Sequence, residues 1–260
     1  MTTDRPRQIE VRPFPRYRHL VTATLRAGKR ATPMHGLIEV DVTDSKRLLA
    51  DHEPALSFTA FIIASVARAA VAHPEVHAYR NWHGQLVWHR YVDIATIVEI
   101  DTPQGPFALG HVIRDADIRD VVDLTSELRT VKTDPSASAS GRWLARYAPI
   151  APRVPGLFAA MGRSPRLRQL MGTVGVTAVG MFAGGGGFAI APLTLMPLQI
   201  VVGGVSPRPR VVRGQIEVRD VLDLTVTIDH NVVDGAPGAR FGAELREIIE
   251  SASVLHDLQR

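Results

Sequence analysis

Residues 221–249 read VLDLTVTIDHNVVDGAPGARFGAELREII. The first eight of these residues are almost all apolar or β-branched, which is typical of a strand buried on both faces. Residues 239–249 carry apolar side chains at helical spacing and predict an amphipathic helix. The loop between them carries His230. Loops held between rigid elements often position catalytic side chains, so this stretch predicts both a fold element and a candidate site.

The rest of the chain alternates between the two kinds of secondary structure. Residues 57–70 are apolar on nearly all sides, which predicts a helix packed against a sheet, and this helix is too short to cross a bilayer. Further helices are expected at 17–29, 43–49 and 118–131, and strands at 34–42, 86–91, 92–100, 107–112, 173–179 and 199–205. The alternation indicates an α/β or α+β class, and we expect a single domain over residues 1–260.

Composition excludes several kinds of site. The chain has no cysteine, which rules out disulfides, zinc–thiolate sites and a cysteine nucleophile. No carboxylate occurs between Asp134 and Glu217, although nine arginines fall there, so the net charge of +4 is locally concentrated. The few aromatic residues beside these arginines lack the spacing of base-stacking modules, which argues against nucleic-acid binding. The charged, proline-containing start does not resemble a secretory signal, and we expect a cytoplasmic protein with no metal.

Residues 132–171 are interpreted as a basic, proline- and arginine-rich insertion within the domain. A linker-like run at 135–141 precedes two short amphipathic segments, at 142–147 and 157–170. The favoured interpretation is a solvated cover with an apolar underside, while contact with a cofactor or a membrane surface stays open. The glycine run 184–187 has no Lys-Ser or Lys-Thr after it, so it is not a P-loop, and it predicts a flexible hairpin.

His230 is the histidine with the strongest signal for catalysis. Asp229 and Asp234 bracket it and Gly235 ends the turn, whereas the other nine histidines lie in no comparable motif. Hydrogen bonds from such neighbours would fix the tautomer and direction of a neutral imidazole, as a general base requires. Asp234 also suits the N-cap of the last helix, and both roles are compatible.

The segment Asp229-His230, followed by Asp234-Gly235 and by residues 239–241, resembles the terminal signature of the catalytic domain of dihydrolipoamide acyltransferases. These are core subunits of 2-oxoacid dehydrogenase complexes and share their fold with chloramphenicol acetyltransferase. Further agreement follows in order at 39–43, 57–63, 73–75, 101–105 and 112–117. The resemblance implies an α+β two-layer sandwich, with a mixed sheet and helices packed on one face.

The resemblance also implies roles for three residues. His230 would be the general base that takes the proton of the acceptor, and Thr177, within 175–182, would donate a hydrogen bond to the oxyanion. For Thr177 the alternative is a β-branched residue chosen for strand packing. Asp234 would organise the site, with an arginine such as Arg18 as partner. The family implies a homotrimer whose sites lie between subunits, so that His230 and Thr177 come from different chains.

The acyl donor and acceptor follow from the same resemblance. Acyl-coenzyme A is the expected substrate, and no individual arginine is assigned to its phosphates. Neither a lipoyl domain nor a peripheral-subunit-binding domain is expected on this chain, and Asn231 and His77 stand where the family usually has arginine and asparagine. The leading hypothesis is therefore a stand-alone acyltransferase that uses acyl-CoA or a carrier-protein thioester and a hydroxyl or thiol of a small molecule. Alternatives are a dihydrolipoamide acyltransferase acting on a lipoyl domain in trans, and a non-catalytic trimeric scaffold.

Overall fold

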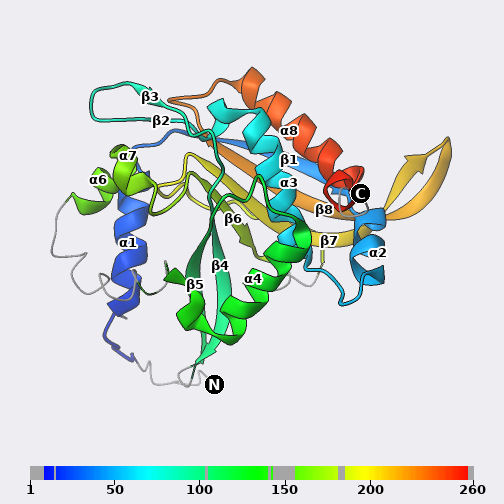
Figure 1. Ribbon diagram of the computed structural model, residues 1–260, viewed down its shortest axis with the longest axis horizontal. Coiled ribbons are helices and arrows are strands. Elements are labelled where there is room, and N and C mark those ends of the chain that lie inside the picture. The colour runs from blue at the N-terminus through cyan, green and yellow to red at the C-terminus, as the bar shows by residue number, and fades with distance from the viewer. Residues whose placement is uncertain are drawn as a thin grey trace, which may run out of the picture.

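A mixed six-stranded sheet organises the computed structural model, which describes residues 9–14, 16–102, 105–139, 142, 156–180 and 185–256 (Figure 1). The strand order is β1-β8-β7-β6-β4-β5, in which β6 runs parallel to both of its neighbours and the other pairs are antiparallel. A small hairpin, β2–β3, stands apart from the sheet. The strands are β1 (Pro33–Asp41), β2 (Tyr79–Arg80), β3 (Leu86–Val87), β4 (Ile94–Thr102), β5 (Gly105–Ile113), β6 (Val174–Ala178), β7 (Leu198–Val212) and β8 (Gln215–Asp229).

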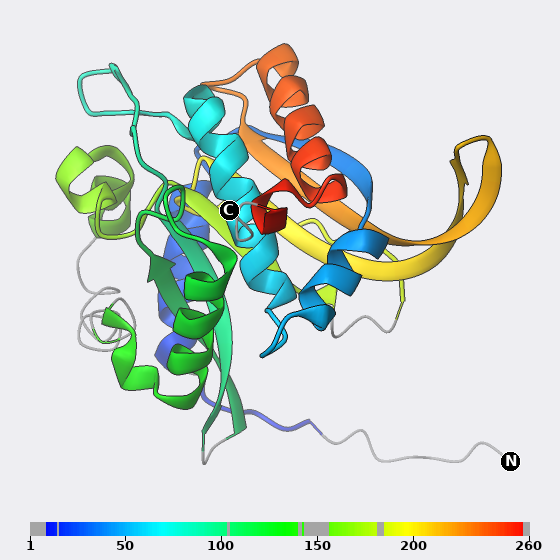
Figure 2. The same cartoon turned by 45° about the vertical axis from the view of Figure 1, so that its right-hand side comes forward.

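Helices cover one face of this sheet. Figures 1 and 2 show α3, α4 and α8 lying across it, and their apolar side chains form the main core together with those of the strands. The helices are α1 (Arg16–Gly28), α2 (Thr43–Asp51), α3 (Phe58–Ala72), η1 (Pro74–His77), α4 (Val121–Thr133), η2 (Pro135–Ala137), α6 (Leu157–Arg163), α7 (Pro165–Arg168), α8 (Gly235–Glu250) and α9 (Ser253–His256). The predicted two-layer arrangement of a mixed sheet and helices is confirmed. No helix in the described ranges is long and apolar enough to cross a membrane.

The stretch that begins at Val221 forms the predicted buried strand. Leu222, Leu224 and Val226 contribute to the main core beneath the helices. Thr225 and Asp223 alternate with them and are also fully buried. The strand is therefore covered on both faces, which agrees with its nearly continuous run of apolar and β-branched residues.

Asp223 fixes the glycine-rich segment on the second face of the sheet. Its side chain has no exposed surface, and its carboxylate accepts hydrogen bonds from the Arg208 guanidinium and from the backbone N–H of Gly187. A Cβ atom at Gly204 would stand 1.8 Å from the carbonyl oxygen of Gly185, so the two backbones lie in direct contact. The flexible hairpin predicted for 184–187 is thus wrong for residues 185–187, which pack against β7; Gly184 lies outside the described residues.

Strands β7 and β8 continue well beyond the ends that the sequence suggested. Pro207 and Pro209 favour a strand that stops near Val205, yet both pair within the β7–β8 ladder, opposite Asp220 and Val218. Proline is tolerated here because this part of the hairpin projects from the sheet (Figure 1), where β7 and β8 pair with each other. The proline nitrogens, which carry no hydrogen to donate, can therefore face the open edge of the hairpin.

The predicted helix at 157–170 is two short helices instead. Ser164 caps α7 by accepting a hydrogen bond from the Leu167 N–H, and Pro165 begins the helix. Proline lacks an N–H and its ring clashes with the preceding turn, so α6 ends at Arg163. Apolar side chains of α6 and α7 pack against Ala23 and Ala27 of α1 in a small cluster separate from the main core. The amphipathic segment predicted at 142–147 lies almost wholly outside the described residues.

Candidate active site

The loop that carries His230 is fixed by hydrogen bonds to the connection between α1 and β1. The backbone N–H of His230 donates to the carbonyl oxygen of Thr32 at 2.8 Å. Asp229 accepts three hydrogen bonds on one carboxylate oxygen, from the Thr32 N–H at 3.0 Å and from the backbone and side-chain nitrogens of Asn231 at 3.1 and 2.8 Å. Asp229 therefore positions the histidine backbone and is not the ring's hydrogen-bond partner.

Asn231 completes this loop anchor, a role that the sequence analysis did not assign. Its side-chain nitrogen also donates to the Arg30 carbonyl oxygen at 3.2 Å, and its amide oxygen accepts from the Thr32 hydroxyl at the same distance. A longer arginine side chain, as the family resemblance leads one to expect at this position, would not reproduce these amide contacts. Asn231 thus stabilises the loop through both ends of its side-chain amide.

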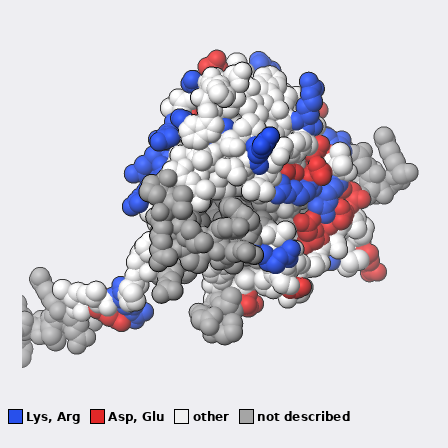
Figure 3. All heavy atoms as spheres, turned by 60° about the vertical axis from the view of Figure 1, so that its left-hand side comes forward, with Lys and Arg blue, Asp and Glu red and all other residues white. Residues whose placement is uncertain are grey.

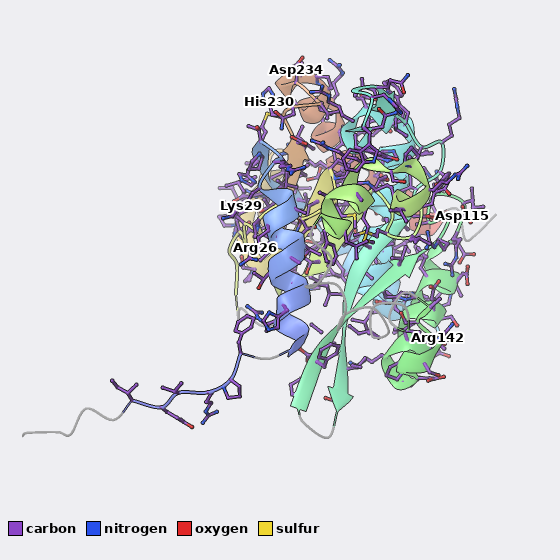
Figure 4. The ribbon with its side chains drawn as sticks, turned by 90° about the vertical axis from the view of Figure 1, so that its left-hand side faces the viewer. Arg26, Lys29, Asp115, Arg142, His230 and Asp234 are labelled. Carbon is purple, nitrogen blue, oxygen red and sulfur yellow. The ribbon has the colours of Figure 1, made fainter. Side chains whose placement is uncertain are left out.

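His230 and Asp234 point toward each other at one end of the molecule (Figure 4). The ring Nδ1 lies 4.0 Å from an Asp234 carboxylate oxygen, which is beyond hydrogen-bond range. The His230 side chain is 44% exposed and that of Asp234 is 91% exposed. Asp234 occupies the N-cap position of α8, as predicted, but its side chain makes no capping hydrogen bond. Both groups are therefore open to a partner that approaches from outside.

Thr177 lies on β6, far from His230 in the same chain. It pairs with Val201 of β7, which in turn pairs with Thr225 of β8, five residues before His230. With about 3.3 Å per residue along a strand and about 4.8 Å between strands, Thr177 and His230 are separated by roughly 15–20 Å. One chain does not bring the two predicted catalytic residues together.

Arg18, suggested as a partner for Asp234, does not fill that role within the chain. It lies in the first turn of α1, whereas the opposite end of that helix approaches the His230 loop (Figure 4). Ten residues of helix separate Arg18 from Gly28, which corresponds to about 15 Å. Among the contacts of the described residues, Asp234 pairs only with His230.

His77 is an interior residue. It has no exposed surface, and its Nδ1 lies 2.8 Å from the Thr173 hydroxyl. Burial, reinforced by the nearby His89, lowers the pKa of His77 to about 4. The side chain therefore stays neutral near pH 7 in the protein interior.

Replacing His77 by asparagine is expected to flatten the pH dependence of stability. Because the folded-state pKa lies below the unfolded value near 6.5, protonation favours unfolding, and stability is lost as pH falls from about 6.5 toward 4. By pH 5 this single group would cost about 2 kcal/mol relative to pH 7. Urea unfolding of wild type and His77→Asn at pH 7 and 5 measures the difference. If wild type and His77→Asn lose the same free energy of unfolding between pH 7 and pH 5, groups other than His77 control the loss of stability in acid.

A cavity of about 380 Å³ borders the His230 loop on the side of α1. Asp229, Asn231 and Val232 form part of its wall, and α6, α7 and the β2–β3 turn supply much of the rest. No cluster of three or more histidine, aspartate or glutamate side chains suited to a metal ion occurs in the described part of the chain.

A family model for the catalytic domain of the 2-oxoacid dehydrogenase acyltransferases matches residues 6–139 and 166–256. A curated relative is the dihydrolipoyllysine-residue acetyltransferase component of the pyruvate dehydrogenase complex of Corynebacterium glutamicum, with 26% identity over 90% of this chain and 32% of that protein. Another is the dihydrolipoyllysine-residue succinyltransferase component of the 2-oxoglutarate dehydrogenase complex of Haemophilus influenzae, with 23% identity over 94% of this chain and 54% of that protein. The chain thus spans a third to a half of the length of these relatives.

Solved structures show the same fold. The cubic core of a pyruvate dehydrogenase multienzyme complex superimposes with a TM-score of 0.70 at 21% identity, covering 95% of this chain and 94% of that one. The dihydrolipoamide acetyltransferase of Azotobacter vinelandii gives the same values. A chloramphenicol acetyltransferase gives a TM-score of 0.52 at 15% identity, covering 93% and 98%. The fold expected from the sequence is confirmed.

Proposed function

We propose that this chain, which belongs to the 2-oxoacid dehydrogenase acyltransferase family, transfers an acyl group between coenzyme A and a dihydrolipoyl thiol. The observation that carries the proposal is the position of His230. It is a solvent-open histidine on a loop anchored through Asp229 and Asn231, within the part of the chain that the family model matches. A rigid backbone with an accessible imidazole is what a general base needs.

The chemistry follows from these groups. The neutral His230 imidazole accepts the proton of the attacking thiol, and the resulting sulfur nucleophile adds to the thioester carbonyl. The Thr177 hydroxyl of a neighbouring subunit donates a hydrogen bond to the tetrahedral oxyanion. Collapse of this intermediate breaks the original carbon–sulfur bond, and the imidazolium returns its proton to the departing sulfur. The complete reaction creates no net charge, and the same groups catalyse acyl transfer in the forward and reverse directions.

A homotrimer is part of the proposal because one chain does not contain a complete site. Strand β7 lies between Thr177 on β6 and the end of β8 that leads to His230, and both His230 and Asp234 are exposed. The Azotobacter vinelandii study names a serine, a histidine and an asparagine in the catalytic mechanism, the asparagine four residues after the histidine. Asp234 likewise follows His230 by four residues. These parallels support assigning Thr177, His230 and Asp234 to a site shared between subunits.

The named relatives favour the dihydrolipoyl acceptor over the small-molecule acceptor that was the leading hypothesis from the sequence. Both relatives described above are dihydrolipoyllysine-residue acyltransferases, although one transfers acetyl and the other succinyl groups. A thiol acceptor also suits the site, because a thiol pKa near 8.5 lies within reach of an imidazole whereas that of an alcohol is far higher. The acyl group itself is left open by these relatives.

The test is an acyl-transfer assay with a panel of acyl-CoA esters. Dihydrolipoamide, a separately expressed lipoyl domain, and hydroxyl-bearing metabolites serve as acceptors, and S-acyl-dihydrolipoyl product is measured by mass spectrometry. We expect product with dihydrolipoamide and faster transfer to the lipoyl domain. Transfer confined to the hydroxyl acceptors would instead support the small-molecule hypothesis, and no transfer to any acceptor would favour the scaffold.

A further inference from the structure

The cavity beside the His230 loop is unusually rich in arginine. Four arginines line it, against one carboxylate, Asp229, whose Oδ1 already accepts three hydrogen bonds. Arg30 comes from the α1–β1 connection, Arg80 from β2, Arg163 from α6 and Arg168 from α7. These segments meet beside the upper end of α1 (Figure 1). Figure 3 shows basic side chains at the left margin and near the centre of the molecule, whereas most acidic ones gather toward the right margin, where further basic ones lie among them.

Arg168 is a buried charged residue in the wall of this cavity. It is 4% exposed, and its guanidinium donates to the carbonyl oxygens of Leu195 and Gly162 and lies 4.5 Å from the centre of the Tyr79 ring. Its Nε atom has no partner among the described residues. Burial lowers the pKa of Arg168 to about 10, so the group stays charged at neutral pH.

A buried guanidinium normally has a carboxylate partner, because an unpaired charge is costly to remove from water. No carboxylate of the described residues forms an ion pair with Arg168, and residues 135–216 contain no aspartate or glutamate at all. Carbonyl groups and an aromatic face offset part of the cost but supply no formal negative charge. The charge of Arg168 is thus not neutralised by a carboxylate of the described residues, and Arg168 is part of the cavity wall.

The wall of the cavity includes residues that the family model does not match. Helix α6 falls within the unmatched residues 140–165, and it contributes Phe158, Gly162 and Arg163 to the lining. The Arg163 guanidinium lies 5.3 Å from the Trp82 ring, which joins α6 to the β2–β3 turn across the cavity. A volume of about 380 Å³ is within the range of small-molecule sites. Part of the cavity wall, including Arg163, therefore lies outside the residues that the family model describes, whereas Arg80 and Arg168 lie within them.

We propose that this cavity binds a carboxylate group of a small-molecule substrate, with Arg168 as the principal ligand and Arg80 and Arg163 adding positive charge at the rim. A guanidinium matches the planar carboxylate with paired hydrogen bonds. The assignment to a substrate rests on the proposed function, whereas binding of the anion does not. The carboxylate belongs either to the transferred acyl group or to the thiol acceptor.

Direct binding is tested first with succinate, by isothermal titration calorimetry on the full chain. Arg168→Met is expected to weaken binding at least about tenfold by removing the charged hydrogen bonds. Arg80→Met, an exposed position whose loss spares the interior, is expected to weaken it about two- to fivefold. Arg166→Met is the matched control, because Arg166 lies on the same helix, is exposed and does not line the cavity. Absence of succinate binding, or equal binding by wild type, Arg168→Met and Arg80→Met, would overturn the proposal.

Kinetics then identify the source of the carboxylate. Succinyl-CoA and butyryl-CoA have four-carbon acyl groups that differ in a terminal carboxylate, and dihydrolipoate and dihydrolipoamide differ in the same way as acceptors. A preference of about tenfold or more for the charged member of one pair, lost in Arg168→Met, assigns the site to that substrate. If neither pair shows a preference that depends on Arg168, the substrate role is rejected. Succinate binding that depends on Arg168 in a protein without transfer activity would support the site while refuting the proposed function.

Discussion

Replacing His230 by alanine is expected to slow acyl transfer by about 10²–10⁴-fold, because the attacking thiol would lose its general base. The fold should persist, since the ring is 44% exposed and makes no hydrogen bond to the described residues. The loop itself is held by the backbone of residue 230 and by the Asp229 and Asn231 side chains, which the substitution leaves in place. Steady-state transfer to dihydrolipoamide at pH 7 measures the effect.

Two comparisons separate a base from a structural residue. His256→Ala removes another exposed histidine, at the end of α9, and should leave the rate unchanged. Added imidazole should restore part of the activity of His230→Ala, because a free base can enter an open site. If His230→Ala retains the wild-type rate, the catalytic assignment is wrong.

Mixing two inactive variants is expected to restore activity. Thr177→Ala should lower the rate by about 10²–10³-fold through loss of an oxyanion donor. In a cyclic trimer with each site between two subunits, a site that receives His230 from one variant and Thr177 from the other is complete. Random assembly of equal amounts of His230→Ala and Thr177→Ala chains makes about a quarter of the sites complete.

Co-expression of the two variants with different affinity tags, followed by tandem purification, gives the hybrid assemblies to be assayed. Each variant assembled alone serves as the control. Recovery of activity in the hybrids would support the shared site proposed from the separation of Thr177 and His230 within one sheet. Hybrids no more active than the single variants would place both residues in one subunit's site, or exclude Thr177 from catalysis.

Much of the fold was evident from local pattern. Strand 221–228, helix α8 and helix α3 follow directly from the order of apolar residues, because burial against a sheet dictates that order. Errors arose where tertiary contacts override local signals. The prolines of β7 are accommodated by an open hairpin edge, and the glycines at 185–187 are held by Asp223 and the β7 backbone, neither of which is visible from neighbouring residues.

The sequence by itself determined the candidate base. His230 stands in a short motif between a buried strand and a helix, and residues adjacent in sequence carry that information. Only the tertiary structure decided that Asp229 and Asn231 anchor the loop to residues 30–32. It also decided that Thr177 lies too far from His230 to act within the same chain. The burial of Arg168 without a carboxylate partner is likewise a property of the folded chain. These properties depend on contacts between segments up to about two hundred residues apart, and the physical consequence of a charge depends on which groups surround it in space.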